Sequence, residues 1–119
     1  MASITEFYAT TSPVSIGQTQ RSLADGSGSS YALIHDQPGI YQLYIDCTNM
    51  QAGDRFDINI YDGITSTIAL DAIYTAVLDG AQSAPFISPA LMLGNFWDMT
   101  ITGTGTGIRS FVWSIRKVG

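Results

Sequence analysis

The clearest strand signals in this chain lie on either side of a polar loop near its middle. Before the loop, apolar residues occupy every second position: Tyr41, Leu43, Ile45 and Cys47. After the loop the same period continues through Phe56, Ile58 and Ile60. Because successive side chains of a strand point to opposite faces, each pattern predicts a strand with one buried and one wet face. We expect these two strands, within Gly39–Gly63, to pair as a β-hairpin.

A second pair of strands is predicted near the C-terminal end. Alternation of apolar and polar residues runs through two sets: Trp97, Met99 and Ile101, then Phe111, Trp113 and Ile115. The stretch GTGTG, Gly103–Gly107, separates the two sets and has the composition of a turn. We therefore predict a second hairpin, whose tryptophans anchor the other half of the core.

The first third of the chain carries weaker patterns. Ile4–Ala9 predicts a short strand that Pro13 must end or push to an edge. Val14–Leu23 is mostly polar, and we expect an extended, exposed segment there. Residues 25–30, DGSGSS, have turn composition and lead into a short strand within YALIHD, residues 31–36.

Two segments in the second half of the chain are each compatible with more than one local structure. Thr65–Asp79 fits a strand and also one face of a helix, and its β-branched residues favour the strand. Pro85 and Pro89 flank a short apolar stretch. Since proline cannot donate a ladder hydrogen bond, this stretch is expected to be an edge strand or a loop that crosses between sheets.

These elements together predict an all-β fold. About eight short strands, with turn signals between them and no convincing helix, indicate an antiparallel β-sandwich or jelly roll. A closed barrel is the alternative. The chain of 119 residues suits a single domain, residues 1–119, with an N-terminal extended segment over about residues 1–24.

Charge is sparse and acidic. Only 13% of the residues are charged, and the formal net charge is -5. Neither nucleic acid nor an anionic membrane is therefore an expected partner, and low surface charge favours a homo-oligomer. The N-terminus lacks the basic and apolar regions of a secretory signal, and no apolar run reaches the roughly 18 residues of a membrane span. We expect synthesis in a reducing cytoplasm.

The chain lacks the residue sets that catalysis requires, so we expect no enzymatic activity, no catalytic residue and no cofactor. His35 is the only histidine and no motif supports it as a base. Cys47, the only cysteine, falls on an apolar strand face and is predicted to be a buried thiol. Asp54, Asp57 and Asp62 lack the spacing of a calcium loop, so no metal is expected.

A family resemblance covers the last two-thirds of the chain, from Gly39 to Val118. The segments that carry it are YQLYID, NMQAGD, RFDINIYD, VLDGAQ, SPAL, WDMT and SFVWSIRKV. This run resembles small virion proteins of tailed bacteriophages, and among these it is similar to head decoration or cement subunits. The resemblance implies a β-sandwich or jelly roll on the capsid exterior. It also implies a small oligomer, with a trimer favoured, that binds the major capsid protein and bridges neighbouring capsomers.

The resemblance transfers no catalytic or ligand residue, so the interface is predicted from the chain itself. The candidates are two N-terminal aromatics, one tyrosine on a wet strand face and two basic residues that could meet acidic capsid groups: Phe7, Tyr8, Tyr61, Arg116 and Lys117. Residues 1 to 8 are expected to be removable without loss of the fold. The alternatives are a tail or neck component of the virion and, from another class, a carbohydrate-binding or host-attachment module using Tyr8, Tyr44 or Tyr61. A small hydrolase ranks third.

Overall fold

A computed structural model describes residues 4–24, 34–35, 37–63, 71–105 and 107–118. All regular structure in these ranges is β, and the strands are β1 (Ile4–Ala9), β2 (Val14–Ile16), β3 (Arg21–Ser22), β4 (Ile34–His35), β5 (Gly39–Asp46), β6 (Arg55–Gly63), β7 (Asp71–Asp79), β8 (Phe86–Ile87), β9 (Leu91–Leu93), β10 (Phe96–Gly103) and β11 (Arg109–Val118). Within the same ranges there is no helix that could cross a membrane. The predicted all-β class is confirmed.

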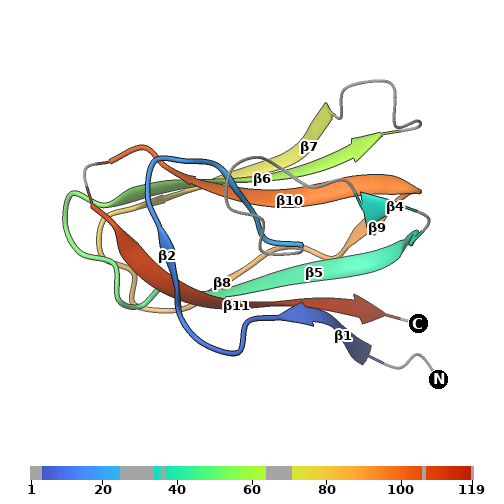
Figure 1. The fold of residues 1–119 in the computed structure, drawn as a ribbon, viewed down its shortest axis with the longest axis horizontal. Coiled ribbons are helices and arrows are strands. Elements are labelled where there is room, and N and C mark those ends of the chain that lie inside the picture. Colours follow the sequence, from blue (N-terminus) through green and yellow to red (C-terminus); the bar gives the residue numbers. More distant parts are fainter. Residues whose placement is uncertain (1–3, 25–33, 36, 64–70, 106, 119) are drawn as a thin grey trace.

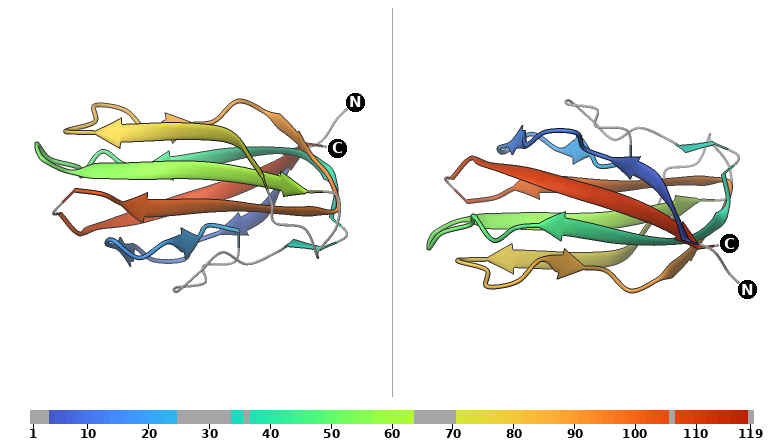
Figure 2. Two further views of the ribbon diagram at one scale, coloured as in Figure 1. Left: turned by 90° about the horizontal axis from the view of Figure 1, so that it is seen from above. Right: turned by 90° about the horizontal axis from the view of Figure 1, so that it is seen from below.

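The strands form two antiparallel sheets that face each other (Figures 1 and 2). The six-stranded sheet has the order β1-β11-β5-β8, with β2 also beside β11 and β9 also beside β5. The five-stranded sheet has the order β3-β10-β6-β7, with β4 also beside β10. The apolar rows of both sheets point inward, so the core lies between the two layers and the chain forms a β-sandwich.

The strand order is that of a jelly roll. Pairing is nested from the outside in: β1 with β11, β3 and β4 with β10, β5 with β8 and β9, and β6 with β7. This is the pattern of one long hairpin folded over into two layers, with β1–β2, β3–β4 and β8–β9 each acting as one interrupted strand. Pairing of β11 with β5 and of β10 with β6 then completes the two sheets.

Both predicted hairpins are wrong in their pairing, although their strands are in the expected places. β5 and β6 lie in opposite sheets, and so do β10 and β11. The chain therefore passes from one sheet to the other after β5, and again after β10, instead of closing a hairpin. Alternation shows which face of a strand is buried, but two strands facing each other across a core have the same pattern as two neighbours in one sheet. The length of residues 47–54 argues against a hairpin, because hairpin loops usually have about two to five residues.

The segment Val14–Leu23 also differs from its prediction, because only part of it is exposed. β2 pairs with β11 in one sheet and β3 pairs with β10 in the other, so the chain crosses the open edge of the sandwich between them. This crossing buries Ile16 and Leu23 completely. The indole nitrogen of Trp113 donates a hydrogen bond of 2.8 Å to the carbonyl oxygen of Leu23, which fastens the segment to the core.

Other sequence predictions agree with the structure. Ile4–Ala9 is the strand β1, and Asp71–Asp79 is the strand β7, which excludes the helical alternative over those residues. β8, between the two prolines, is an edge strand. Residues 25–33 and 64–70, which include the predicted turn DGSGSS, lie outside the described residues.

An aromatic cluster fills the core near the two chain ends. The rings of Tyr41 and Trp97 have centroids 4.5 Å apart, and the ring of Phe7 lies 5.4 Å from Tyr41 and 5.3 Å from Trp97. Phe7 reaches this position because the register of β1 shifts between Glu6 and Tyr8, as at a β-bulge. The N-terminal segment is thus part of the sandwich, and the expectation that residues 1 to 8 can be removed without harm to the fold is not supported.

Candidate functional site

The outward face of the six-stranded sheet carries an uncovered row of apolar side chains. Ile4 lies opposite Val118, Val118 opposite Ile40, and Ile40 opposite Met92. Directly opposed residues of a sheet point to the same face, so these four residues form one row across the sheet, here called the apolar row. Ile4, Ile40 and Met92 are 70%, 38% and 81% exposed. Exposed apolar groups gathered in this way mark an interaction surface.

Polar side chains occupy the next row of the same face, which Figure 2 (right) views from outside. Glu6, Arg116 and Gln42 lie opposite one another. The guanidinium carbon of Arg116 is 4.9 Å from the centre of the Tyr44 ring, and the Ser114 hydroxyl donates to Glu6 over 2.8 Å. The cation–π contact holds the Arg116 charge in a defined position on the surface.

Two hollows follow β11 on this face and share Val112 between them. One has a volume of about 220 Å³ and includes Glu6, Tyr44 and Arg116 in its wall. The other has a volume of about 210 Å³ and includes Asp46 and Asn49. Each is below the roughly 300 Å³ at which pockets for drug-sized ligands begin, so the hollows suit small groups, such as side chains of a partner, better than a drug-sized ligand.

Asp46 supplies a negative charge at the rim of this face. The hydroxyl and the backbone N–H of Thr48 both donate to its Oδ1, over 2.7 and 3.2 Å. The pKa of Asp46 is lowered, first by the side-chain hydrogen bond from Thr48 and then by the backbone one. The carboxylate therefore stays charged at mildly acidic pH.

The five predicted interface residues do not come together in space. Phe7 packs in the core, and Tyr8 packs inward with its ring centroid 6.4 Å from that of Trp113. Tyr61 lies in the five-stranded sheet, opposite Asp98 of β10. Arg116 lies on the outward face of the six-stranded sheet, beside the apolar row. Lys117 lies with its ammonium nitrogen 5.8 Å from the centre of the Tyr41 ring.

Sequence reasoning missed the apolar row, although part of it left a signal. Ile40 falls in the polar phase of its strand, together with Gln42, Tyr44 and Asp46. An apolar residue in that phase points away from the core, which indicates a surface that contacts a partner. Ile4 and Met92 had no such signal, because only the strand register places them beside Ile40.

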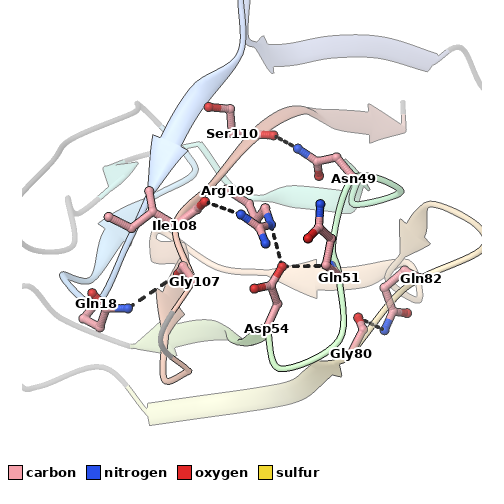
Figure 3. Close-up of polar contacts among 10 residues, drawn as sticks. All are labelled: Gln18, Asn49, Gln51, Asp54, Gly80, Gln82, Gly107, Ile108, Arg109 and Ser110. Atoms are coloured by element: carbon pink, nitrogen blue, oxygen red, sulfur yellow. Dashed lines mark hydrogen bonds and ion pairs between the residues drawn. The ribbon is translucent and has the colours of Figure 1, made fainter.

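At the end of the sandwich farthest from the chain termini, several loops meet around Asp54 (Figures 1 and 3). The carboxylate is 2% exposed, and it accepts hydrogen bonds from Arg109 Nε over 2.6 Å and from the Gln51 N–H over 2.9 Å. The backbone oxygen of Asp54 accepts from the Gly80 N–H over 2.8 Å. Asp54 therefore connects three loops, and its polar atoms have structural partners.

The glycines of GTGTG allow the loops around Asp54 to approach each other closely. A Cβ at Gly107 would collide with the Asp54 carboxylate, and a Cβ at Gly103 would lie 2.5 Å from the Gly17 carbonyl oxygen. The sequence predicted turn residues here. The structure shows that these two positions are glycine because no side chain fits.

The three aspartates considered for a calcium site lie in separate structural contacts. Asp54 is paired with Arg109, and Asp57 is 3.7 Å from Arg55. Asp62 accepts hydrogen bonds from the N–H groups of Gly63 and Gly94. Across the described ranges no three His, Cys, Asp or Glu side chains are grouped so as to hold a metal ion.

Cys47 is buried and carries a free thiol, as the sequence predicted. Its sulfur donates to the Ala84 carbonyl oxygen over 3.5 Å. Burial raises the pKa of Cys47 above its ordinary value of 9.0, and burial likewise raises the pKa of Tyr41. A reactive thiol needs a lowered pKa, so Cys47 is not arranged as a nucleophile.

We predict that the free energy of unfolding falls as the pH rises through 9.0. Since the folded-state pKa of Cys47 is raised, the folded protein holds the thiol proton more tightly than the unfolded chain does. This contribution to stability is complete below the unfolded pKa and is lost as the pH rises through the folded pKa. Urea unfolding between neutral and alkaline pH measures it. Cys47→Ala should flatten the early part of the decline, and an equal decline in that variant would contradict the assignment.

Comparison of the chain with protein-family models, with curated protein sequences and with solved structures gives no match. The protein is thus described by its fold and surface: it is an all-β jelly-roll sandwich, and the apolar row on one of its sheets is exposed. The resemblance of residues 39–118 to phage virion proteins stays a prediction.

Proposed function

We propose that this protein is a non-enzymatic structural subunit of a phage virion that attaches to the outside of the capsid. The observation that supports this most is the apolar row on the outward face of the six-stranded sheet. Burying such a row against a partner is favourable by roughly 25 cal/mol for each Å² of apolar surface removed from water. The resemblance to decoration subunits and the jelly-roll topology agree with this role, and the partner it implies is the major capsid protein.

The same face supplies polar contacts beside the apolar row. Arg116 is held over the Tyr44 ring, next to Glu6 and Gln42, and can pair with an acidic group of the partner. A partly apolar centre with a polar margin is the usual composition of a specific protein interface. In this proposal, trimers or other small oligomers bridge neighbouring capsomers. Attachment at several sites then makes the shell harder to open than one contact would.

Replacing Ile40 with threonine and Met92 with serine in one variant is expected to weaken capsid binding at least about tenfold, because a fully buried large apolar side chain contributes about 1.5–3 kcal/mol. Both side chains are exposed in the subunit, at 38% and 81%, so the fold should persist. Co-sedimentation of purified subunits with heads of the encoding phage that lack the protein measures the affinity.

The matched control for this experiment lies on the other sheet. Ile73 and Val77 of β7 are 46% and 52% exposed, and Ile73→Thr with Val77→Thr replaces exposed apolar groups on that sheet. This control variant should bind as the unchanged protein does. Full occupancy of the heads by the Ile40 and Met92 variant, or equal loss in both variants, would contradict the assigned face.

A carbohydrate-binding or host-attachment module is the second candidate. It is favoured by one of the two hollows along β11, in which Tyr44 lies among the polar side chains of Glu6 and Arg116. A glycan array separates the candidates, because this module predicts a specific signal that Tyr44→Ala abolishes. A tail or neck component would use the same apolar row, and imaging of labelled virions distinguishes it from a head subunit.

A further inference from the structure

A cavity of about 270 Å³ lies along the crossing from β2 to β3, away from the apolar row. Its polar wall contains Ser15, Gln18, Thr19 and Arg21, and its apolar wall contains Ile16 and Ile108. Figure 3 shows two of these wall residues, Gln18 and Ile108, beside the loops that surround Asp54. Thr19 and Ile108 are exposed, so the cavity opens to the surface. We call it the Arg21 cavity.

Arg21 is exceptional among the basic residues of this chain, of which there are five. Arg55 and Arg109 pair with carboxylates at 3.7 and 2.6 Å, and Arg116 and Lys117 lie over tyrosine rings. The Nε–H of Arg21 is buried and has no hydrogen-bond partner. A guanidinium is always charged in proteins, and a buried donor without a partner is costly.

The position of Arg21 follows from the sheet. Arg21 lies opposite Ile101 in the short pairing of β3 with β10, so its backbone is held at the edge of the sandwich. Ile101 points into the core, and a residue directly opposite points to the same side. The Arg21 side chain therefore leaves its strand on the inner side of the sheet, and Arg21 is one of the residues that line the cavity.

The other groups of the cavity complement a negative charge. Ser15 and Thr19 carry hydroxyl groups that can donate hydrogen bonds, with Ser15 already 3.4 Å from the Ser110 hydroxyl, and none of the wall residues that the structure describes carries a carboxylate. The amide nitrogen of Gln18 is already used, because it donates to the Gly105 carbonyl oxygen over 2.8 Å. Within the described part of the chain, the cavity wall therefore presents one positive charge and neutral donors.

We propose that the Arg21 cavity binds a carboxylate group. The planar guanidinium can bind a carboxylate through two parallel hydrogen bonds. The single positive charge of Arg21 balances the single negative charge of a carboxylate. A phosphate dianion would leave one negative charge unbalanced on a chain whose net charge is already -5. Since a water molecule takes roughly 30 Å³ of liquid, the volume admits a carboxylate with a short attached chain. This inference does not depend on the proposed capsid role.

Titration of the ¹⁵N-labelled protein with sodium acetate, at ionic strength held constant with chloride, tests the proposal. The amide resonances of Gly17 and Ile108 should shift and saturate. Arg21→Met should weaken binding at least about tenfold, because it removes the charged hydrogen bonds. Arg55→Met is the matched control, since Arg55 lies outside the cavity, and it should bind as the unchanged protein does. A parallel titration with N-acetylglutamate amide distinguishes the acidic side chain of a partner, which binds tighter than acetate, from a free organic acid, which does not.

Several results would overturn the proposal. These are the absence of a saturable shift in the unchanged protein, equal affinity in Arg21→Met, and tighter binding of inorganic phosphate than of acetate. The spectrum itself reports whether Arg21→Met is folded. If it is not, Arg21→Lys replaces it: this variant keeps the charge but loses the planar fork, and it should bind acetate more weakly than the unchanged protein. If Arg21→Lys bound acetate as tightly as the unchanged protein, the paired hydrogen bonds of the guanidinium would not be required, and the proposal would be wrong.

Discussion

Replacing Trp97 with alanine is expected to lower the free energy of unfolding by about 4 kcal/mol, because large-to-small changes of a buried aromatic residue cost roughly 3–5 kcal/mol. Trp97 has no exposed surface and is the largest of the fully buried side chains that the structure describes. Its removal takes away the ring contacts with Tyr41 and Phe7, and the hydrogen bond of 3.0 Å from its indole nitrogen to the Gln37 carbonyl oxygen. These contacts join β1 and β5 of one sheet to β10 of the other.

Urea unfolding followed by circular dichroism measures this loss. Trp97→Phe should cost clearly less, because it keeps an aromatic ring in the cluster. The surface control is Ile87→Ala, at a side chain that is 54% exposed, and its effect should stay within about 0.5 kcal/mol. A loss below about 1 kcal/mol for Trp97→Ala would mean that the aromatic cluster does not hold the two sheets together.

Replacing Asp54 with alanine is expected to cost about 3 kcal/mol, since removing one partner of a buried ion pair leaves the other charge uncompensated. The side chains of Asp54 and Arg109 are 3% and 27% exposed, and their atoms approach to 2.6 Å. The variant also leaves the Gln51 N–H without its acceptor. The loops at that end of the sandwich should therefore loosen together, which hydrogen exchange of residues 47–54 and 104–108 would detect.

The exposed ion pair between Arg55 and Asp57 is the matched control. Its atoms are 3.7 Å apart and its side chains are 51% and 34% exposed. Asp57→Ala should cost less than about 1 kcal/mol, because solvent screens such a pair. Replacing both Asp54 and Arg109 with apolar residues should restore part of the loss, since neither charge is then left alone. Equal effects of Asp54→Ala and Asp57→Ala would show that Asp54 does not organise the loops.

The strand positions and their buried faces could be predicted from the sequence alone. Tyr41, Leu43 and Ile45, and likewise Phe56, Ile58 and Ile60, are all fully buried, as their alternation indicated. This works because the direction of a side chain on a strand is a local property with a period of two. The burial of Cys47 followed from the same local rule.

Of the candidate site, the sequence predicted Arg116 as an interface residue and Tyr44 as a residue of the alternative binding module. Phe7 and Tyr8 were predicted to meet a partner, but a shift of register in β1 lets Phe7 turn into the core beside Trp97. The apolar row could not be predicted, because Ile4, Val118, Ile40 and Met92 come from four strands that are distant in the sequence.

Which strands become neighbours is fixed only when the two sheets assemble. The alternation of apolar and polar residues determined that β5, β6, β10 and β11 are strands with one apolar face. It did not determine that β5 and β6, or β10 and β11, face each other across the core. The two arrangements bury the same side chains, so local periodicity does not distinguish them. The choice depends on long-range pairing and on how closely the loops can pack, as at Gly103 and Gly107. Both are properties of the assembled sandwich.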